Sequence, residues 1–462
     1  MLAPPDDSNR PEPLSAPSED RSLPSENRSL LSEDRSAASE DRSLPSEDRS
    51  PESATPRDQS RLRAELSRGV ALLRGAGPEY PVGLSLIAFS IAAPVFIRLS
   101  APGARSDIAA HAAVAARMVK DGGWISYTLW YPLIYLTSSG NSDPKLLREL
   151  SVGFLLIAVV AKTLLVYYFS WVSTRHRTAS AIIAMLMLVA MPIINPWNSH
   201  AIYSGQISAN VWHNSTQIFA LPFSVAAFIA AVALLRVQTM PRAALLGITI
   251  LASTLAKPNY TLALLPALGL MLLWTLLRAK TQAIKVLAML CLVSLPSMLL
   301  LAYQYLVVYG QSGTASTVLS FAPFATWTLF TDNIPLSILR SVAGPLAVLL
   351  LLPRKARTDP ALVLSWMVLG VALVQLASFA ERLVNGPIAT AGDFFWGTFS
   401  AVFMVFVASA IALARTYLAG PHSSGRRVAL FAAVMIMTVH AATGLYYLGR
   451  AGEGGFPVWR YR

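Results

Sequence analysis

A succession of eleven apolar stretches between residues 82 and 448, most of them long enough to cross a bilayer, constrains the fold of this chain more than any other feature. A spanning helix needs about 17 to 25 predominantly apolar residues. The sequence therefore predicts an all-α polytopic membrane protein of about eleven transmembrane helices, the fifth of them short. These helices are expected near 82–99, 151–171, 178–195, 217–236, 243–257, 260–277, 284–307, 336–353, 360–380, 395–415 and 427–448.

The overall composition excludes an ordinary soluble domain. Charged residues make up 13% of the chain, against about 25% in typical soluble domains. The single cysteine, Cys291, lies in an apolar stretch, so we expect no intramolecular disulfide and no cysteine-based metal site. Low charge and many alanines favour a bacterial inner membrane.

Residues 1–79 differ from the rest and are predicted to form a disordered cytoplasmic tail. A seven-residue unit of the type SEDRSLP recurs from Ser18. Each unit offers only one or two weakly apolar positions, and proline recurs at its seventh position, so the tail lacks the apolar surface that would offset the entropy of ordering it. A mixed-charge tail without chemistry and a docking segment for a cytoplasmic partner are both open interpretations. No signal peptide is expected at the N-terminus.

The transmembrane body, residues 80–462, carries 26 basic and nine acidic residues. Its basic residues gather in alternate connections, which the positive-inside rule places in the cytoplasm together with the tail. The charge excess is thereby explained by topology, and no nucleic-acid partner is expected. These connections contain Arg175, Arg177, Arg236, Arg242, Arg278, Lys280, Lys285, Arg354, Lys355, Arg357, Arg415, Arg426 and Arg427.

The same topology predicts an extracytoplasmic site and a C-terminus on that side. Of the nine acids in the body, only Asp359 falls in a predicted cytoplasmic connection. The other eight fall in predicted outer segments, namely Asp107, Asp121, Asp143, Glu149, Asp332, Glu381, Asp393 and Glu453.

One outer stretch, 195–222, is unusually rich in polar and aromatic side chains and has no charged residue. A simple connection between two helices needs a few polar residues, not rings, amides and imidazoles at this density. We therefore expect a binding site built from Trp197, His200, Gln206, Asn210, Trp212, His213 and Asn214.

The long first outer loop, about 100–150, holds a carboxylate and an imidazole four residues apart. Asp107 and His111 would share one face of a short helix that runs to about residue 119. There they could act as general base and proton partner, or bind a cation. Equally, Asp107 or Ser106 could simply cap an interfacial helix. Residues 124–136, rich in Trp and Tyr and too short to span, predict a re-entrant or interfacial segment.

Two lysines are candidates for function. Lys257 ends a predicted helix at the outer face before Pro258, where a point charge with amide and imidazole donors would hold a phosphate. Lys162 lies near the middle of the second predicted helix and either serves a pathway or pairs within the bundle. The candidate amide and imidazole donors beside Lys257 are His213, Asn214 and Asn259. A second, mixed-charge cluster with aromatic walls, suited to sugars, is expected from Glu381, Arg382, Asp393 and Trp396.

These features together resemble the GT-C superfamily of integral-membrane glycosyltransferases, which use polyprenyl-phosphate-linked sugars. The resemblance covers about 81–449. It rests on Asp107 in a large first outer loop, on a juxtamembrane helix after it, and on about eleven spans. The strings from Gly205 to Phe223, Lys257-Pro258, and 392–397 also resemble motifs of uncharacterised bacterial multispanning proteins of this type.

The resemblance implies an inverting transfer of a sugar from a polyprenyl-phosphate donor to a lipid, glycan or protein acceptor on the extracytoplasmic side. Asp107 would be the catalytic base, assisted by His111, while Lys257, His213 and Arg382 would hold the lipid phosphate. Use of a divalent metal ion stays open. The alternatives are a lipid-linked glycan ligase or polymerase, a membrane transporter or flippase, and a noncatalytic scaffold.

Overall fold

The computed structural model describes residues 77–101, 104, 106–121, 128–194, 205–278, 280–309, 317–384, 386–388, 393–420 and 422–452. The chain divides into two units, residues 1–62 and residues 63–462, and all described residues belong to the second. The predicted tail therefore lies outside the described residues, apart from positions 77–79. Trp197 and His200 also lie outside them.

Each of the eleven predicted apolar stretches falls largely on a helix, although the third, predicted at 178–195, continues beyond α6, which ends at Val189. Among the described residues, eight helices are long and apolar enough to cross a membrane, as a multi-pass membrane protein requires. Helices α6 and α8 and the searched part of α9 are apolar but shorter. The eleven helices are α2 (Glu79–Leu99), α5 (Pro144–Thr174), α6 (Arg177–Val189), α7 (Ser215–Arg236), α8 (Met240–Ala256), α9 (Asn259–Arg278), α10 (Lys280–Tyr309), α12 (Ile334–Leu351), α14 (Pro360–Ser378), α15 (Asp393–Leu418) and α16 (Ser424–Gly452).

Two of these helices form the interior of the bundle. In the most apolar window of each helix, 94% of α15 and 72% of α7 are buried, against 22% of α10. Helix α15 packs against α14, α9 and α12, and α7 packs against α8 and α5. Because packing on all sides fixes a helix most firmly, side chains at the first turns of α7 and α15 are well positioned for a site.

The remaining elements are short. They are α3 (Asp107–Asp121), α4 (Trp130–Thr137), α11 (Ala325–Thr328), α13 (Arg354–Arg357), β1 (Thr317–Phe321) and β2 (Phe379–Leu383). The strands pair antiparallel, with Leu319 opposite Glu381. This small sheet departs from the predicted all-α fold. At one end of the pair the rings of Phe321 and Phe379 meet edge to face, with centroids 6.2 Å apart, a cross-strand contact that stabilises such pairs.

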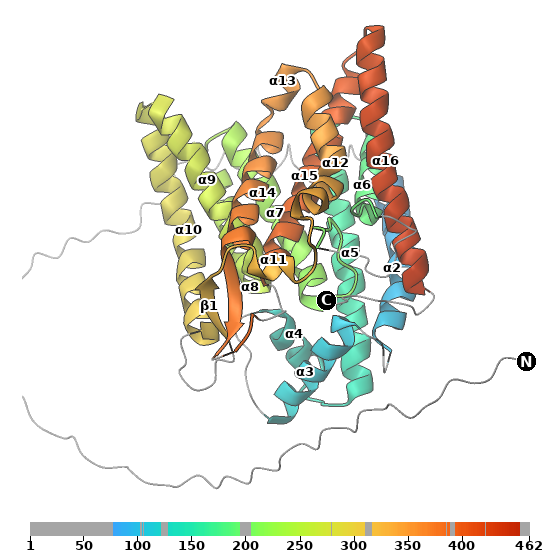
Figure 1. Ribbon diagram of the computed structural model, residues 1–462, viewed down its shortest axis with the longest axis vertical. Helices are drawn as coiled ribbons and strands as arrows, with labels where there is room; N and C mark the ends of the chain where they lie inside the picture. Colours follow the sequence, from blue (N-terminus) through green and yellow to red (C-terminus); the bar gives the residue numbers. More distant parts are fainter. Residues whose placement is uncertain are drawn as a thin grey trace, which may run out of the picture. The chain divides into compact units, whose positions relative to one another are not determined.

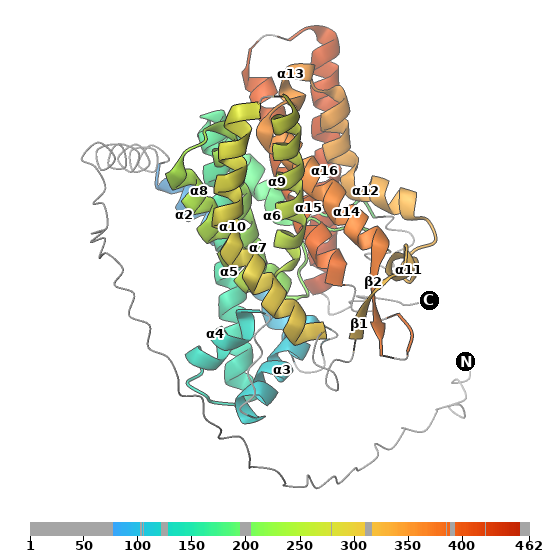
Figure 2. The same cartoon turned by 90° about the vertical axis from the view of Figure 1, so that its left-hand side faces the viewer.

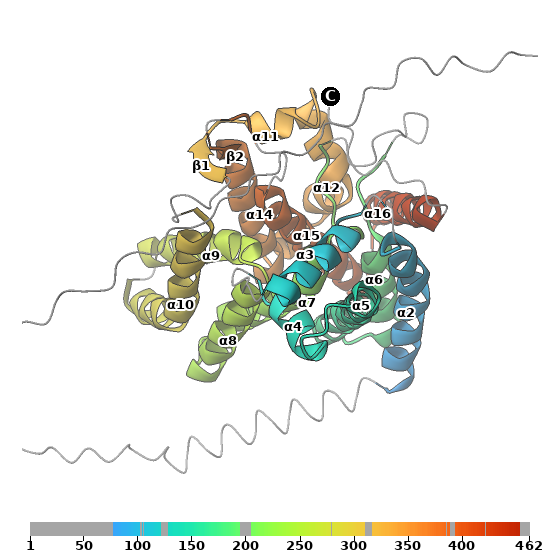
Figure 3. The ribbon, with the colours of Figure 1, turned by 90° about the horizontal axis from the view of Figure 1, so that it is seen from below.

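The short elements divide between the two ends of the bundle (Figures 1 and 2). Helices α3 and α4 and the two strands lie at one end, called here the site end, and α13 lies at the opposite end, called the α13 end. Seen from the site end, α3 lies in front of the helix ends (Figure 3). At the α13 end, Arg236 of α7 and Arg415 of α15 both form ion pairs with Asp359, which also caps α14.

Candidate functional site

Asp107 begins α3 at the site end, and its carboxylate points toward the bundle. The first-turn cap of α3 comes from Ser106, whose Oγ accepts a hydrogen bond from the backbone N–H of Ile108 (3.1 Å). Ser106 also donates from Oγ to the backbone carbonyl of His213 (3.2 Å). Asp107 is therefore not needed as the cap, and its Oδ2 instead accepts a hydrogen bond from Nδ2 of Asn214 (2.8 Å). Of the two residues that the sequence offers as the cap of this helix, Asp107 and Ser106, the structure assigns the cap to Ser106.

Asn214 connects Asp107 to the start of α7. It is the N-cap residue of α7, and its Oδ1 accepts a hydrogen bond from the backbone N–H of Gln217 (2.9 Å), the usual role of asparagine at this position. The same Oδ1 accepts a hydrogen bond from Oγ1 of Thr216 (2.9 Å). A single buried side chain thus caps a central helix and orients a carboxylate of another helix.

Lys257 completes a chain of hydrogen bonds that ends at Asp107. Its Nζ donates to Oγ1 of Thr216 (2.9 Å), Thr216 donates to Asn214, and Asn214 donates to Asp107. All three bonds run in the same direction, and such chains polarise and strengthen one another. Lys257 and Asp107, 150 positions apart in the sequence, are therefore held in one network.

The surroundings of Lys257 set its charge. The residue follows the last residue of α8, and its Nζ lies 4.5 Å from the ring centroid of Trp396, a favourable cation–π contact. Burial lowers the pKa of Lys257 to about 8, although the carboxylates of Asp393, Asp107 and Glu381 act in the opposite direction. Lys257 is partly buried and is consequently a cation at pH 7 that loses its proton only slightly above that pH.

Of the described helices, four begin around Lys257. Helices α3 and α7 are joined by the Asp107–Asn214 bond, and α9 is joined to α15 because Nδ2 of Asn259 donates to the carbonyl of Asp393 (2.7 Å). Gly397 permits this approach, since a Cβ there would lie 2.7 Å from the carbonyl oxygen of Asn259. Helix N-termini carry partial positive charge and favour anions. The site end therefore combines an ammonium group with several positive helix ends.

The two histidines of the site are neutral at physiological pH. Nδ1 of His111 lies 2.6 Å from the hydroxyl of Tyr131 on α4. Burial and the charge of Lys257 lower the pKa of His111 to about 4, while Asp107 acts in the opposite direction. Burial likewise lowers the pKa of His213 to about 4, and its ring lies 6.2 Å from that of Trp396. Both imidazoles can therefore share hydrogen bonds, as predicted for a donor at a phosphate site, and neither adds positive charge to the site.

Of two neighbouring residues on strand β2 that were predicted for the site, Glu381 and Arg382, only Glu381 lies near Lys257. Glu381 is buried, with 4% of its surface exposed, and acts on the charge of Lys257. The next residue, Arg382, is exposed and donates from Nη1 to the carbonyl of Gly386 (3.4 Å). Successive side chains of a strand point to opposite faces. The structure therefore brings Glu381 to the network around Lys257 and leaves Arg382 on the other face.

Three predicted residues lie deeper in the bundle than the network. Nε2 of Gln206 donates to the carbonyl of Ile193 (3.2 Å). Asn210 donates from Nδ2 to the carbonyls of Met187 and Ala190 (2.9 and 2.8 Å). Trp212 is almost fully buried against Phe96 of α2, with ring centroids 5.7 Å apart. Their contacts hold the segment before α7 inside the bundle.

Lys162 lies with this deeper group. Its Nζ donates to Oδ1 of Asn210 (2.6 Å) and lies 5.8 Å from the ring centroid of Trp212 and 5.2 Å from that of Phe403. The amide oxygen and the two rings compensate part of the cost of placing an ammonium group in a membrane interior. Of the two interpretations offered by the sequence, these contacts favour pairing within the bundle.

Sequence reasoning missed two residues that contact the predicted ones. Thr216 links Lys257 to Asn214, and Tyr131 contacts His111. Thr216 could have been found from its place two residues after a capping asparagine, because that turn lies against the cap. Tyr131 lies in the aromatic segment predicted to be interfacial, and nothing in its spacing indicates His111 as its partner.

Within the part of the chain that the structure describes, no group of three or more His, Cys, Asp or Glu residues is arranged to hold a metal ion. No family model matches the chain, and no curated protein matches it. The likeness to GT-C glycosyltransferases thus stays a prediction. Function has to be inferred from the contacts at the site end.

Proposed function

We propose that the protein is a membrane glycosyltransferase that moves a sugar from a polyprenyl-phosphate-linked donor to an acceptor hydroxyl, with inversion at the anomeric carbon. The observation that carries the proposal is the hydrogen-bond chain joining a carboxylate, Asp107, to a partly buried cation, Lys257, where four described helices begin. A base and an anion site held at a fixed separation are what transfer from a phosphate leaving group requires.

Lys257 would bind the phosphate of the donor. The ammonium group and the helix N-termini at the site end favour a dianion or monoanion, and their effect grows as negative charge develops on the departing oxygen. Since a lipid phosphate lies near the membrane surface, the anion site has to lie at an end of the bundle. Lys257 meets this requirement, because it stands directly after the last residue of α8.

Asp107 would act as general base. Its carboxylate takes the proton from the acceptor hydroxyl while the acceptor oxygen forms a bond to the anomeric carbon. The bond from that carbon to the phosphate oxygen breaks, and its electron pair leaves with the lipid phosphate. Asn214 keeps the carboxylate oriented throughout by donating to Oδ2.

Sugar hydroxyls would bind to the polar groups beside Lys257. Asp393 and Glu381 supply carboxylates, and His213 and His111 supply neutral imidazoles. Neutral imidazole suits hydroxyl recognition because one ring nitrogen donates and the other accepts. A lipid-linked glycan ligase or polymerase would use the same base and cation with a larger donor.

The topology completes the proposal. The eight long helices together with α6, α8 and α9 would make eleven crossings, with the site end extracytoplasmic and the α13 end cytoplasmic in a bacterial inner membrane. The ion pairs of Arg236 and Arg415 with Asp359 at the α13 end support this orientation, since arginine concentrates in short cytoplasmic connections.

Glycosyl transfer by the purified full-length protein in detergent tests the proposal, with a panel of polyprenyl-phosphate sugars as donors. Asp107→Asn keeps an acceptor for Asn214 and removes the base, so we expect kcat to fall about 10² to 10⁴-fold while donor binding persists. Asp143→Asn is the matched control, because Asp143 is exposed, caps α5 and would be replaced by an equally good cap. Normal turnover by Asp107→Asn would refute the role of Asp107. Transport without turnover would favour the flippase alternative.

A further inference from the structure

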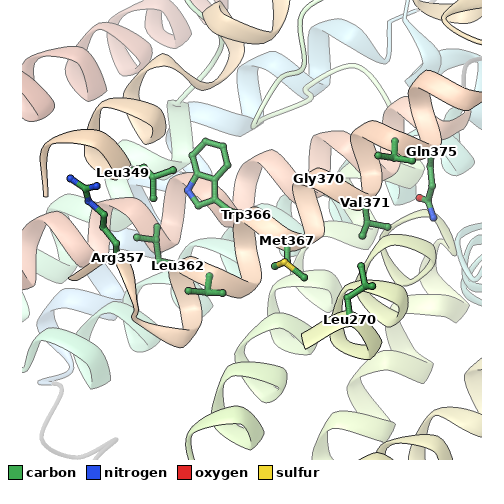
Figure 4. Close-up of a pocket in the computed structure, with 11 residues that line it drawn as sticks. Leu270, Leu349, Arg357, Leu362, Trp366, Met367, Gly370, Val371 and Gln375 are labelled. Atoms are coloured by element: carbon green, nitrogen blue, oxygen red, sulfur yellow. The ribbon is translucent and has the colours of Figure 1, made fainter. Parts of the chain in front are cut away.

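An apolar groove runs along α14 on the outside of the bundle, separate from the site around Lys257. Its volume is about 710 Å³, within the range of pockets that bind small molecules. Leu270 of α9, Leu349 of α12 and Arg357 at the end of α13 line it together with α14 (Figure 4). Because almost all of the lining is hydrocarbon, its occupant has to be apolar along most of its length.

The groove is long and narrow in the direction of the helix. Its α14 lining extends from Leu362 to Gln375, and thirteen residues of α-helix rise by about 20 Å. The hydrocarbon core of a bilayer is about 30 Å thick. Because α14 is one of the helices long enough to cross a membrane, a groove of this length along it exceeds the depth of one leaflet and can hold an extended hydrocarbon chain.

A cationic group stands at the α13 end of the groove. The guanidinium of Arg357 donates from Nε to the carbonyl of Leu352 (2.8 Å) and from Nη2 to that of Leu350 (2.6 Å). These bonds use two of the five N–H groups of a guanidinium and fix its plane at the end of α12. Arg357 is exposed and is the arginine that lines the groove, so its remaining N–H groups can reach an anion at the membrane surface.

We infer that the groove binds one acyl chain of an anionic phospholipid whose headgroup phosphate contacts Arg357. Hydrocarbon along the groove and a positively charged end match such a lipid in both charge and shape. Arginine near a membrane surface attracts anionic lipids, and it binds phosphate through parallel N–H groups. The occupant comes from the leaflet at the α13 end, opposite to the donor proposed at Lys257. The inference does not depend on glycosyl transfer.

Native mass spectrometry of the purified full-length protein in detergent tests this inference. Equal amounts of dioleoyl phosphatidylglycerol and dioleoyl phosphatidylcholine are added, and singly lipid-bound protein is counted. We expect about a fivefold preference for phosphatidylglycerol, from one arginine at the membrane surface. Arg357→Gln should abolish the preference. Its control is Arg426→Gln, which removes an exposed arginine at the start of α16 and should leave the preference unchanged.

A second variant tests the groove itself. Gly370 lines the groove, and a Cβ there would meet no atom within 4 Å, so Gly370→Phe should fill the groove without a clash and remove the bound lipid of either kind. Gly153→Phe on α5 is the control, since Gly153 has equally open surroundings. Unchanged binding in Gly370→Phe, or an unchanged preference in Arg357→Gln, would overturn the inference. Displacement of phosphatidylglycerol by undecaprenyl phosphate would overturn it as well and assign the groove to a polyprenyl chain.

Discussion

Two lysines removed from bulk solvent, the buried Lys162 and the partly buried Lys257, show how differently the same residue type is used within one protein. Lys162 donates a hydrogen bond to Asn210, shortly before α7, and Lys257 donates one to Thr216 in the first turn of α7. Both also lie against a tryptophan ring. Burial, a polar partner and an aromatic contact therefore do not by themselves distinguish a functional lysine from a structural one.

The distinction lies in what surrounds each ammonium group. Lys162 is in the middle of α5, between an amide oxygen and two rings. Lys257 stands at the end of α8, where three carboxylates act on its charge and where α7 and α9 begin. The charge of Lys257 is partly neutralised by carboxylates that can also bind hydroxyls, so Lys257 can exchange these partners for a ligand. Lys162 is enclosed by apolar side chains and one amide, and this environment suits a structural role.

The largest effect is expected from removing each ammonium group in turn. Lys257→Met should lower kcat/KM for glycosyl transfer about 10² to 10³-fold, the usual loss when one group that stabilises a developing anion is deleted. Lys162→Met, of similar size, should leave kcat/KM within about threefold of wild type, since a buried charge can be replaced by an apolar side chain without disruption. Equal losses of activity in the two variants would remove the distinction drawn here.

A double-mutant cycle of unfolding free energies tests whether Lys162 has the structural role that distinguishes it from Lys257. Asn210→Leu leaves the buried ammonium group without its acceptor and should lower the free energy of unfolding by about 3 kcal/mol. In the background of Lys162→Met the same change should cost about 2 kcal/mol less, because no charge is left unpaired. Thermal unfolding of the four purified proteins in one detergent measures this coupling. Additive effects of the two substitutions would show that the hydrogen bond from Lys162 to Asn210 does not stabilise the buried charge.

The pH dependence of transfer reports the charge of Lys257. The protonated form binds phosphate, and burial lowers the pKa of Lys257 to about 8, so kcat/KM should fall about tenfold from pH 7 to pH 9 as the proton is lost. In Lys257→Arg the guanidinium stays charged, and the decline over this range should disappear whatever the absolute rate. A decline that persists in the arginine variant would have to come from another group.

The smallest effect is expected from the link between Lys257 and Asn214. Thr216→Val removes the hydroxyl that accepts from Lys257 and donates to Asn214, a loss of roughly 1 kcal/mol per hydrogen bond. We expect kcat/KM to fall about fivefold to tenfold, with the midpoint of thermal unfolding nearly unchanged. Thr254→Val on α8, where Thr254 donates to the carbonyl of Ile250, is a control for hydroxyl loss in the bundle and should transfer normally.

The helices were predictable from sequence because each carries its own signal. A run of apolar residues specifies a helix locally, since a membrane interior leaves backbone groups no other partner. The turn between α8 and α9 was likewise predicted at Lys257, Pro258 and Asn259. The pairing of β1 with β2 was not predictable, because the strands are five residues each and lie far apart in the sequence.

The sequence predicted which residue types form the candidate site, but it did not predict which of them turn away from the site into the bundle. Asp107, Asn214 and Lys257 share a side of the membrane in the predicted topology, and the structure joins them. Asn210 and Trp212 belong to the same polar stretch, yet they turn into the bundle and meet Lys162. Only tertiary packing decides which polar residues of an irregular segment face a site, since such a segment has no periodicity from which to infer direction.

The double role of Asn214 limits which residues can replace it. Serine and aspartate are both good helix caps, but serine is too short to reach Asp107 as well, and aspartate would place a second carboxylate beside it. Asn214 both accepts from the backbone of α7 and donates to Asp107, which demands an acceptor and a donor on one short side chain. Among the common capping residues only asparagine carries the acceptor and the donor on two separate atoms, so the start of a central helix and the orientation of the carboxylate can change only together.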